Sequence, residues 1–213
     1  MHNITLICTK HIEIGNCNSK ELHRIIEEIN PEVIFEELSQ TAYKECYGIK
    51  NRTTVETSAI KMYLRNHDLE HIPVVDSELS DDLYSKIEFM CKHDSYRKLM
   101  DTLLLSEGKF GFQFLNSEYC DELFEEMKTA EKLILEDKDD EILVRINQRS
   151  NENIDNYENG IIKNVYRYSE ENTYNTAIMF IGAAHRKSIM QKIQEYQMKQ
   201  KIKLNWILYN NQF

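Results

Sequence analysis

The sequence predicts an α/β fold with a mainly parallel central sheet flanked by helices, and three observations support this prediction. Five short runs are typical of strands, and most of them are almost continuously apolar, as strands that are covered on both faces should be. The longer stretches between them carry apolar residues at helical spacing. The chain has only two prolines and six glycines, which argues against a turn-rich, all-β fold.

The N-terminal part predicts a strand, a helix and a second strand. The strands are expected over residues 4–9 and 32–38. Between them, residues 19–30 carry an apolar stripe, with Ser19 as the expected N-cap and Pro31 directly after the helix. This order is typical of a βαβ unit, in which the two strands are parallel and the crossover is right-handed.

The same logic continues to the C-terminus. A helix is expected within 54–69, and it leads to a third strand over 71–76. The fourth and fifth strands are expected over 177–183 and 204–209, with a helix between them. Strand, helix and strand at both ends of the chain indicate one parallel sheet.

The chain is predicted to be a single domain over residues 1–213. Its core would combine residues 1–77 and 171–213, with a helical insertion over about 78–170 between the third and fourth strands. The insertion is rich in Glu, Asp, Lys and Leu, and its acidic runs are interpreted as solvated helix faces.

Composition limits the function classes. The formal net charge of -10 argues against nonspecific binding to nucleic acid, which needs clusters of Lys and Arg. No apolar stretch approaches the roughly 20 residues that span a bilayer. The five cysteines form no CxxC motif and no secretory signal precedes the first strand, so a cytoplasmic protein is expected. A small molecule or peptide is the expected partner, and the oligomeric state is left open.

Polar residues follow four of the predicted strands. His11 follows the first strand, Glu37 lies at the end of the second, Asp76 ends the third, and His185 follows the fourth. Parallel strands open their carboxyl ends at one edge of the sheet, where ligands usually bind. We therefore expect two histidines and two or three carboxylates to meet there.

Two of these carboxylates allow more than one interpretation. Glu36 and Glu37 are consecutive strand residues and point to opposite faces, so only one of them is expected to face the site. Asp76 either belongs to the site or caps a helix that begins near Glu78.

Imidazole and carboxylate groups are suitable ligands for zinc, manganese or cobalt. The helix that follows His185 would place the positive end of its dipole at the ring and keep it neutral. A bound cation would lower the pKa of its water to about 7. Alternatively, Glu37 would act as a general base without a metal, and His11 would orient or protonate the leaving group.

Three short motifs resemble those of the TraB and Tiki superfamily, which includes erythromycin esterases and ChaN haem-binding lipoproteins. Members carry a Gly-x-x-His, then Pro-Asp-x-x-x-x-Glu-Leu, and finally a second Gly-x-x-His. The counterparts here are CTKH, PEVIFEEL and GAAH, at 8–11, 31–38 and 182–185. This sequence departs from the pattern at Cys8, where the family has glycine, and at Ser77, where a basic residue is frequent.

The resemblance implies a metal-dependent hydrolase that acts on a carbonyl-type bond, in a peptide or an ester. It places Glu37 on the family glutamate and makes His11, Glu37, His185 and Asp76 the candidate metal ligands. Arg149 resembles an arginine upstream of the last motif, which makes it a candidate substrate ligand, and the polar stretch 151–160 is a candidate mobile lid beside it.

Two other functions are compatible with the same fold. The site would bind a small ligand or haem without turnover, or the acidic insertion would bind a regulatory partner.

Overall fold

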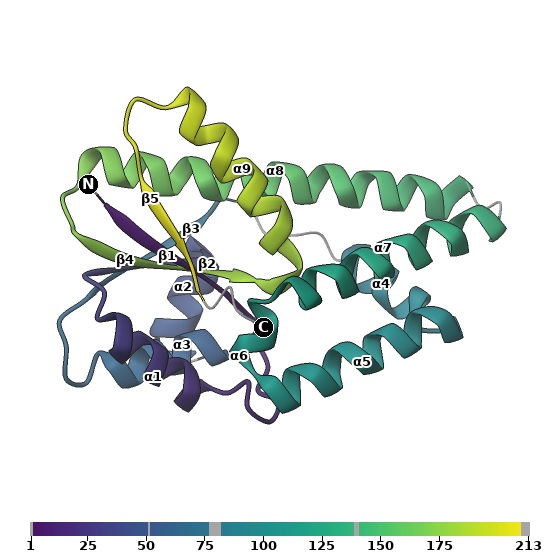
Figure 1. The fold of residues 1–213 in the computed structure, drawn as a ribbon, viewed down its shortest axis with the longest axis horizontal. Helices are drawn as coiled ribbons and strands as arrows, with labels where there is room; N and C mark the ends of the chain where they lie inside the picture. Colours follow the sequence, from purple (N-terminus) through teal and green to yellow (C-terminus); the bar gives the residue numbers. More distant parts are fainter. Residues whose placement is uncertain (1, 51, 77–81, 139–140, 210–213) are drawn as a thin grey trace.

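A five-stranded parallel sheet forms the centre of the protein (Figure 1). The computed structural model describes residues 2–50, 52–76, 82–138 and 141–209. The strand order is β3-β2-β4-β1-β5, and each pair is parallel. The α/β class with a parallel sheet is therefore confirmed. The strands are β1 (Asn3–Thr9), β2 (Val33–Ser39), β3 (Glu70–Val75), β4 (Thr176–Gly182) and β5 (Asn205–Leu208).

The fourth strand lies between the first two. β4 pairs with β1 on one side, where Thr9 aligns with Gly182, and with β2 on the other, where Phe35 aligns with Met179. The strands of the expected N-terminal βαβ unit are thus parallel but not neighbours. This order brings the end of β2 beside the end of β4, although the two segments are far apart in sequence.

Helices cover both faces of the sheet (Figure 1). The first of them, α1, is preceded by Asn18, whose side chain accepts hydrogen bonds from the backbone N–H groups of Lys20 and Glu21. The prediction of Ser19 as N-cap is wrong by one residue, because the Ser19 hydroxyl donates to Glu13 instead. The helices of the core are α1 (Ser19–Ile29), α2 (Gln40–Tyr47), α3 (Val55–Tyr63) and α9 (Arg186–Lys199).

The described chain between β3 and β4 is helical. Its elements are α4 (Asp82–Met90), α5 (Asp94–Phe110), α6 (Phe112–Leu115), α7 (Glu118–Lys138) and α8 (Glu141–Glu171). In Figure 1, α5 and α7 extend away from the sheet, whereas α8 runs back along it and leads into β4. None of the helices is long and apolar enough to cross a membrane, within the residues that the structure describes.

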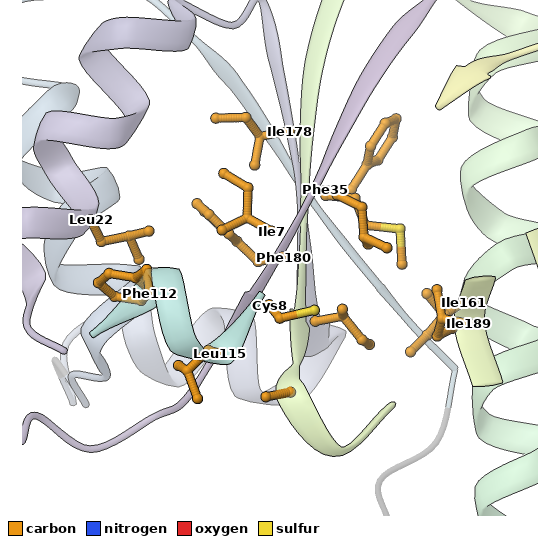
Figure 2. Close-up of a cluster of buried hydrophobic side chains, with 14 of the residues drawn as sticks. Ile7, Cys8, Leu22, Phe35, Phe112, Leu115, Ile161, Ile178, Phe180 and Ile189 are labelled. Atoms are coloured by element: carbon orange, nitrogen blue, oxygen red, sulfur yellow. The ribbon is translucent and has the colours of Figure 1, made fainter. Parts of the chain in front are cut away.

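The buried core extends over both faces of the sheet (Figure 2). Ile178 and Phe180 point toward α1 and α6, whereas Phe35 points to the other face, toward Ile161 of α8. Each of these side chains is at most 1% exposed. The alternation follows from the two-residue period of a strand, and coverage on both faces explains why these strands are continuously apolar in sequence.

One side chain of the insertion completes the end of β1. β5 pairs with β1 only as far as Leu6. Beyond it, the amide of Asn116 accepts a 2.8 Å hydrogen bond from the backbone N–H of Cys8 and donates one of 3.0 Å to its carbonyl. Asn116 thus replaces a missing strand partner and satisfies backbone groups that are buried.

Candidate active site at the carboxyl edge of the sheet

Glu37 lies at the end of β2 and points toward β4 and α8. Its Oε2 accepts a hydrogen bond from the backbone N–H of Gly182, and its Oε1 accepts one of 2.8 Å from the hydroxyl of Tyr157. The side chain is 9% exposed. Of the two consecutive glutamates, Glu37 is therefore the one that faces the end of β4.

His185 lies beside Glu37, at the end of the short 3-10 helix η1 (Ala183–His185) that follows β4. Its Nε2 is 3.8 Å from Oε1 of Glu37, and its Nδ1 donates a 2.7 Å hydrogen bond to Oε1 of Glu158. The residue is buried. Two of the predicted site residues, one from each half of the chain, are thus brought together.

The pKa of His185 is shifted in the direction opposite to the expected one. Burial opposes the charged form, but the hydrogen bond that His185 donates to Glu158 and the negative charge of Glu37 outweigh it and raise the pKa of His185 above its ordinary value. This direction is opposite to the one that the prediction of a helix dipole favouring the neutral ring implies. Two nearby carboxylates act more strongly on the ring than the partial charge of a helix end.

Two site residues, Tyr157 and Glu158, were not predicted from the sequence. They lie on α8, within the segment 151–160 that was expected to form a mobile lid. The segment is helical instead, and its Glu158 is only 2% exposed. Besides His185, Glu158 accepts a hydrogen bond from the hydroxyl of Ser188 and lies 3.7 Å from Nζ of Lys192.

His11 follows β1 and lines a cavity together with Glu37. Its Nδ1 donates a 3.2 Å hydrogen bond to Oε1 of Glu56, which is buried and also accepts from the hydroxyl of Thr9. The hydrogen bond to Glu56 raises the pKa of His11 to about 9, and the charge of Glu37 adds to the effect. The His11 side chain is 55% exposed, so solvent reaches the imidazole.

A small cavity of about 10 Å³ lies next to His11 and Glu56. Its lining consists of His11, Glu36, Glu37, Leu38, Thr54, Glu56, Thr57 and Phe180. That volume is close to the space one water molecule needs, and polar side chains around it offer the hydrogen bonds that a buried water requires.

Asp76 lies against α8, whereas Arg149 is exposed on that helix. Oδ1 of Asp76 accepts a 2.8 Å hydrogen bond from Asn164 of α8. The alternative role of Asp76, as cap of a helix near Glu78, falls on residues 77–81, outside the described part of the chain. Arg149 is exposed on α8, about two helical turns before Tyr157. The structure does not bring Arg149 to the other candidate residues.

The donor groups fit a divalent cation in their chemistry. Both His11 and His185 direct Nδ1 to a carboxylate, which is the arrangement that usually orients a metal-binding imidazole, and Nε2 of His185 faces Glu37 at 3.8 Å. Their positions fit less well. Among the described residues, no three His, Cys, Asp or Glu side chains surround a common point as metal ligands would. The pair of His185 and Glu37 has suitable chemistry but does not form a ligand shell alone.

The opposite face of β2 holds a second polar cluster around Glu36, which is 2% exposed. Glu36 accepts a 2.7 Å hydrogen bond from the hydroxyl of Tyr47 and one of 2.6 Å from Nδ1 of His71. The hydroxyl of Tyr43 lies 3.3 Å from Nε2 of the same histidine. Glu36 therefore belongs to the packing of α2 and β3 against β2.

Comparison with known proteins adds no relative: no family model, curated protein or solved structure matches this chain. The similarity to the TraB and Tiki superfamily thus depends on the three short motifs alone.

Proposed function

We propose that the chain is a hydrolase that activates water for attack on a carbonyl-type bond, in an ester or a peptide. The observation that supports this best is that His11 and Glu37 both line one water-sized cavity. A carboxylate on one side of a water and an imidazolium on the other are the two groups that general acid–base hydrolysis requires.

In this proposal Glu37 is the general base and His11 is the general acid. Glu37 takes a proton from the water, whose oxygen attacks the carbonyl carbon. The bond to the leaving alcohol or amine then breaks, and the leaving group receives a proton from His11. With a pKa of about 9, His11 is protonated at neutral pH, and its exposure lets a substrate reach it. The proton held by Glu37 returns to His11 through solvent.

His185 and Tyr157 are positioning residues in this scheme. The hydroxyl of Tyr157 and the backbone N–H of Gly182 hold the two oxygens of Glu37, and Nε2 of His185 lies 3.8 Å from one of them. Glu158 keeps the imidazole of His185 oriented through Nδ1. These contacts fix the carboxylate before substrate binds, which reduces the cost of ordering it in the transition state.

The superfamily resemblance implies a divalent cation in addition. His11, Glu37 and His185 would hold it, with Asp76 in support, and Mn²⁺, Co²⁺ or Zn²⁺ suits such ligands. The cation would lower the pKa of a bound water and polarise the carbonyl oxygen. Because His11 and His185 both have raised pKa values, binding of a cation to their ring nitrogens would release protons.

The test is hydrolysis of p-nitrophenyl acetate and of a fluorogenic peptide mixture, before and after chelation and reloading with each metal. Wild type is compared with Glu37→Gln and His11→Gln, and with Glu170→Gln as a matched control on an exposed part of α8. We expect Glu37→Gln and His11→Gln to lose about 10²–10⁴-fold in rate and Glu170→Gln to lose none. Activity in folded Glu37→Gln at the wild-type level would refute the general-base role.

The pH profile separates the two forms of the proposal. For the metal-free form, the rate should fall as the pH rises through about 9, where His11 loses its proton. Elemental analysis of purified protein and of His11→Ala and His185→Ala tests the cation directly. Metal in near-stoichiometric amount, lost in both variants, would support the metal-dependent form. Absence of turnover with every probe would instead favour a small-ligand or haem-binding protein.

A further inference from the structure

A surface groove lies apart from the site of Glu37 and His185. It has a volume of about 920 Å³ and is lined by α7 and α9, whose first turns lie close together in Figure 1. Its apolar lining comes from four elements: Leu99 of α5, Leu133 of α7, Met190 of α9 and Leu208 of β5. Leu133 is 62% exposed. An exposed leucine next to further apolar side chains in a groove is typical of a binding surface.

The rim of this groove is acidic. Asp121 and Glu125 on α7 are neutralised locally, by ion pairs to Arg186 and Lys187 of α9 respectively. A separate row consists of Glu118, Glu122 and Glu126, which are exposed at four-residue spacing along α7. None of these three forms an ion pair with a cation within the described residues. The groove therefore combines an apolar floor with a row of uncompensated negative charges.

The dimensions fit a helix better than a small molecule. From Glu118 to Leu133, the lining face of α7 is about 22 Å long, which is the length of a helix of about 15 residues. A second cavity of about 690 Å³ shares Met190 and Leu208 with the first and continues along α9. It is bordered by Met198, which is 80% exposed. An open, elongated groove of this kind offers a large contact area but does not enclose a compact ligand.

We propose that this groove binds a basic amphipathic helix of a partner protein. Apolar side chains of that helix, spaced three and four residues apart, would enter the floor beside Leu133 and Met190. Lysine and arginine side chains on its flank would face Glu118, Glu122 and Glu126. This charge complementarity, which no acidic or neutral helix would provide, identifies the chemistry of the partner.

The test uses three labelled peptides of about 16 residues each and fluorescence anisotropy with the full chain. The first has leucines on one helical face and lysines on the other. The second has the same composition in scrambled order, and the third has glutamate in place of each lysine. We expect saturable binding of the first peptide, weakened by added salt because exposed charges are screened, and no comparable binding of the other two.

Two variants locate the binding site on the protein. Glu122→Lys with Glu126→Lys, and separately Leu133→Asp, change exposed side chains, so the fold should persist. Each is expected to weaken binding of the first peptide by about tenfold or more, or about 1.4 kcal/mol. The matched control, Glu170→Lys with Glu171→Lys, reverses the same number of exposed charges at the far end of α8 and should leave binding unchanged.

Several results would overturn the proposal. Equal affinity for the scrambled or the acidic peptide would show that no amphipathic basic helix is recognised. Unchanged binding in both groove variants would place the peptide elsewhere. Absence of peptide binding, together with self-association that Leu133→Asp abolishes, would assign the groove to a second copy of this chain. Hydrolysis by the site of Glu37 is not involved, so its failure leaves these outcomes interpretable.

Discussion

Replacing Glu158 with Gln removes the negative charge beside His185 while keeping the size of the side chain. Glu158 is 2% exposed, and its Oε1 accepts a 2.7 Å hydrogen bond from Nδ1 of His185. A hydrogen bond that involves a charged group contributes about 1.5–3 kcal/mol, and about 1.4 kcal/mol corresponds to a tenfold change in proton binding. We therefore expect Glu158→Gln to lower the pKa of His185, with proton binding weaker by about tenfold or more.

The same substitution should make stability depend less on pH. The pKa of His185 in the folded protein is raised above its unfolded value. The stabilisation from its protonated form is therefore fully present below the unfolded pKa, about 6.5, and is lost as the pH rises through the folded pKa. The free energy of unfolding of Glu158→Gln should fall below that of wild type mainly at the acidic end of this window.

The assay is an NMR titration of the His185 ring, combined with urea unfolding at a series of pH values. The control is Glu152→Gln, the same change at an exposed position of the same helix, which should behave as wild type. An unchanged pKa of His185 in folded Glu158→Gln would refute the reasoning. A loss of stability that is equal at all pH values would show that Glu158 acts by packing rather than by charge.

Three further predictions concern the core, the end of β1 and the thiols. Ile178→Ala, at a fully buried site, should lower the free energy of unfolding in urea by about 2–5 kcal/mol. The same change at Ile12, which is 75% exposed, should stay within about 0.5 kcal/mol, and equal losses would contradict the burial argument. Asn116→Ala leaves two backbone groups of Cys8 without their partner, at a cost of about 1–3 kcal/mol each. Amide hydrogen exchange at Cys8 should therefore be faster than in wild type, and an equal or slower rate would contradict this. In the folded protein, Cys91 should react fastest with the thiol reagent DTNB, because the other four cysteines are buried, and a second fast thiol would disprove it.

The existence and type of the sheet elements could be predicted from the sequence, but their order could not. The strand-like runs at 4–9, 32–38 and 177–183 coincide closely with β1, β2 and β4, because a strand covered on both faces is mostly apolar. Strand pairing uses backbone groups that every residue carries. An apolar run therefore does not identify its neighbour, and the position of β4 between β1 and β2 was not visible.

The site residues that stand at strand ends could be predicted from the sequence, whereas the residues that α8 contributes could not. His185 and Glu37 stand directly at strand ends, so the topology of a parallel sheet places them at one edge. Glu158 lies in a segment dominated by Asn, Asp and Glu, and such composition suggests a solvated chain. The available signal for a helix was the helical spacing of Ile154, Ile161 and later apolar residues, a pattern into which Glu158 also falls. Burial of a glutamate depends on a partner distant in sequence, which no local pattern reports.

The neighbouring glutamates of β2 explain how one strand end serves two separate polar clusters. Successive strand residues face opposite sides, so Glu36 and Glu37 cannot share a partner. Burial of a carboxylate without hydrogen bonds costs roughly several kcal/mol. Each face of the sheet must therefore supply hydrogen-bond donors for its own glutamate. Tyr47 and His71 do so for Glu36, whereas Tyr157 and a backbone N–H of β4 do so for Glu37.

This division also has a geometric consequence. The pairing of β2 with β3 is regular up to Glu36 and shifts in register between Glu36 and Ser39. The contacts of Glu36 hold β2 against α2 and β3 at the point where the shift begins. Pairing with β3 resumes only at Ser39, opposite Val75, and within this irregular stretch the side chain of Glu37 contacts β4 and α8 instead. The carboxylate proposed to activate water is thus oriented from one side of the sheet and anchored, through its neighbour, from the other.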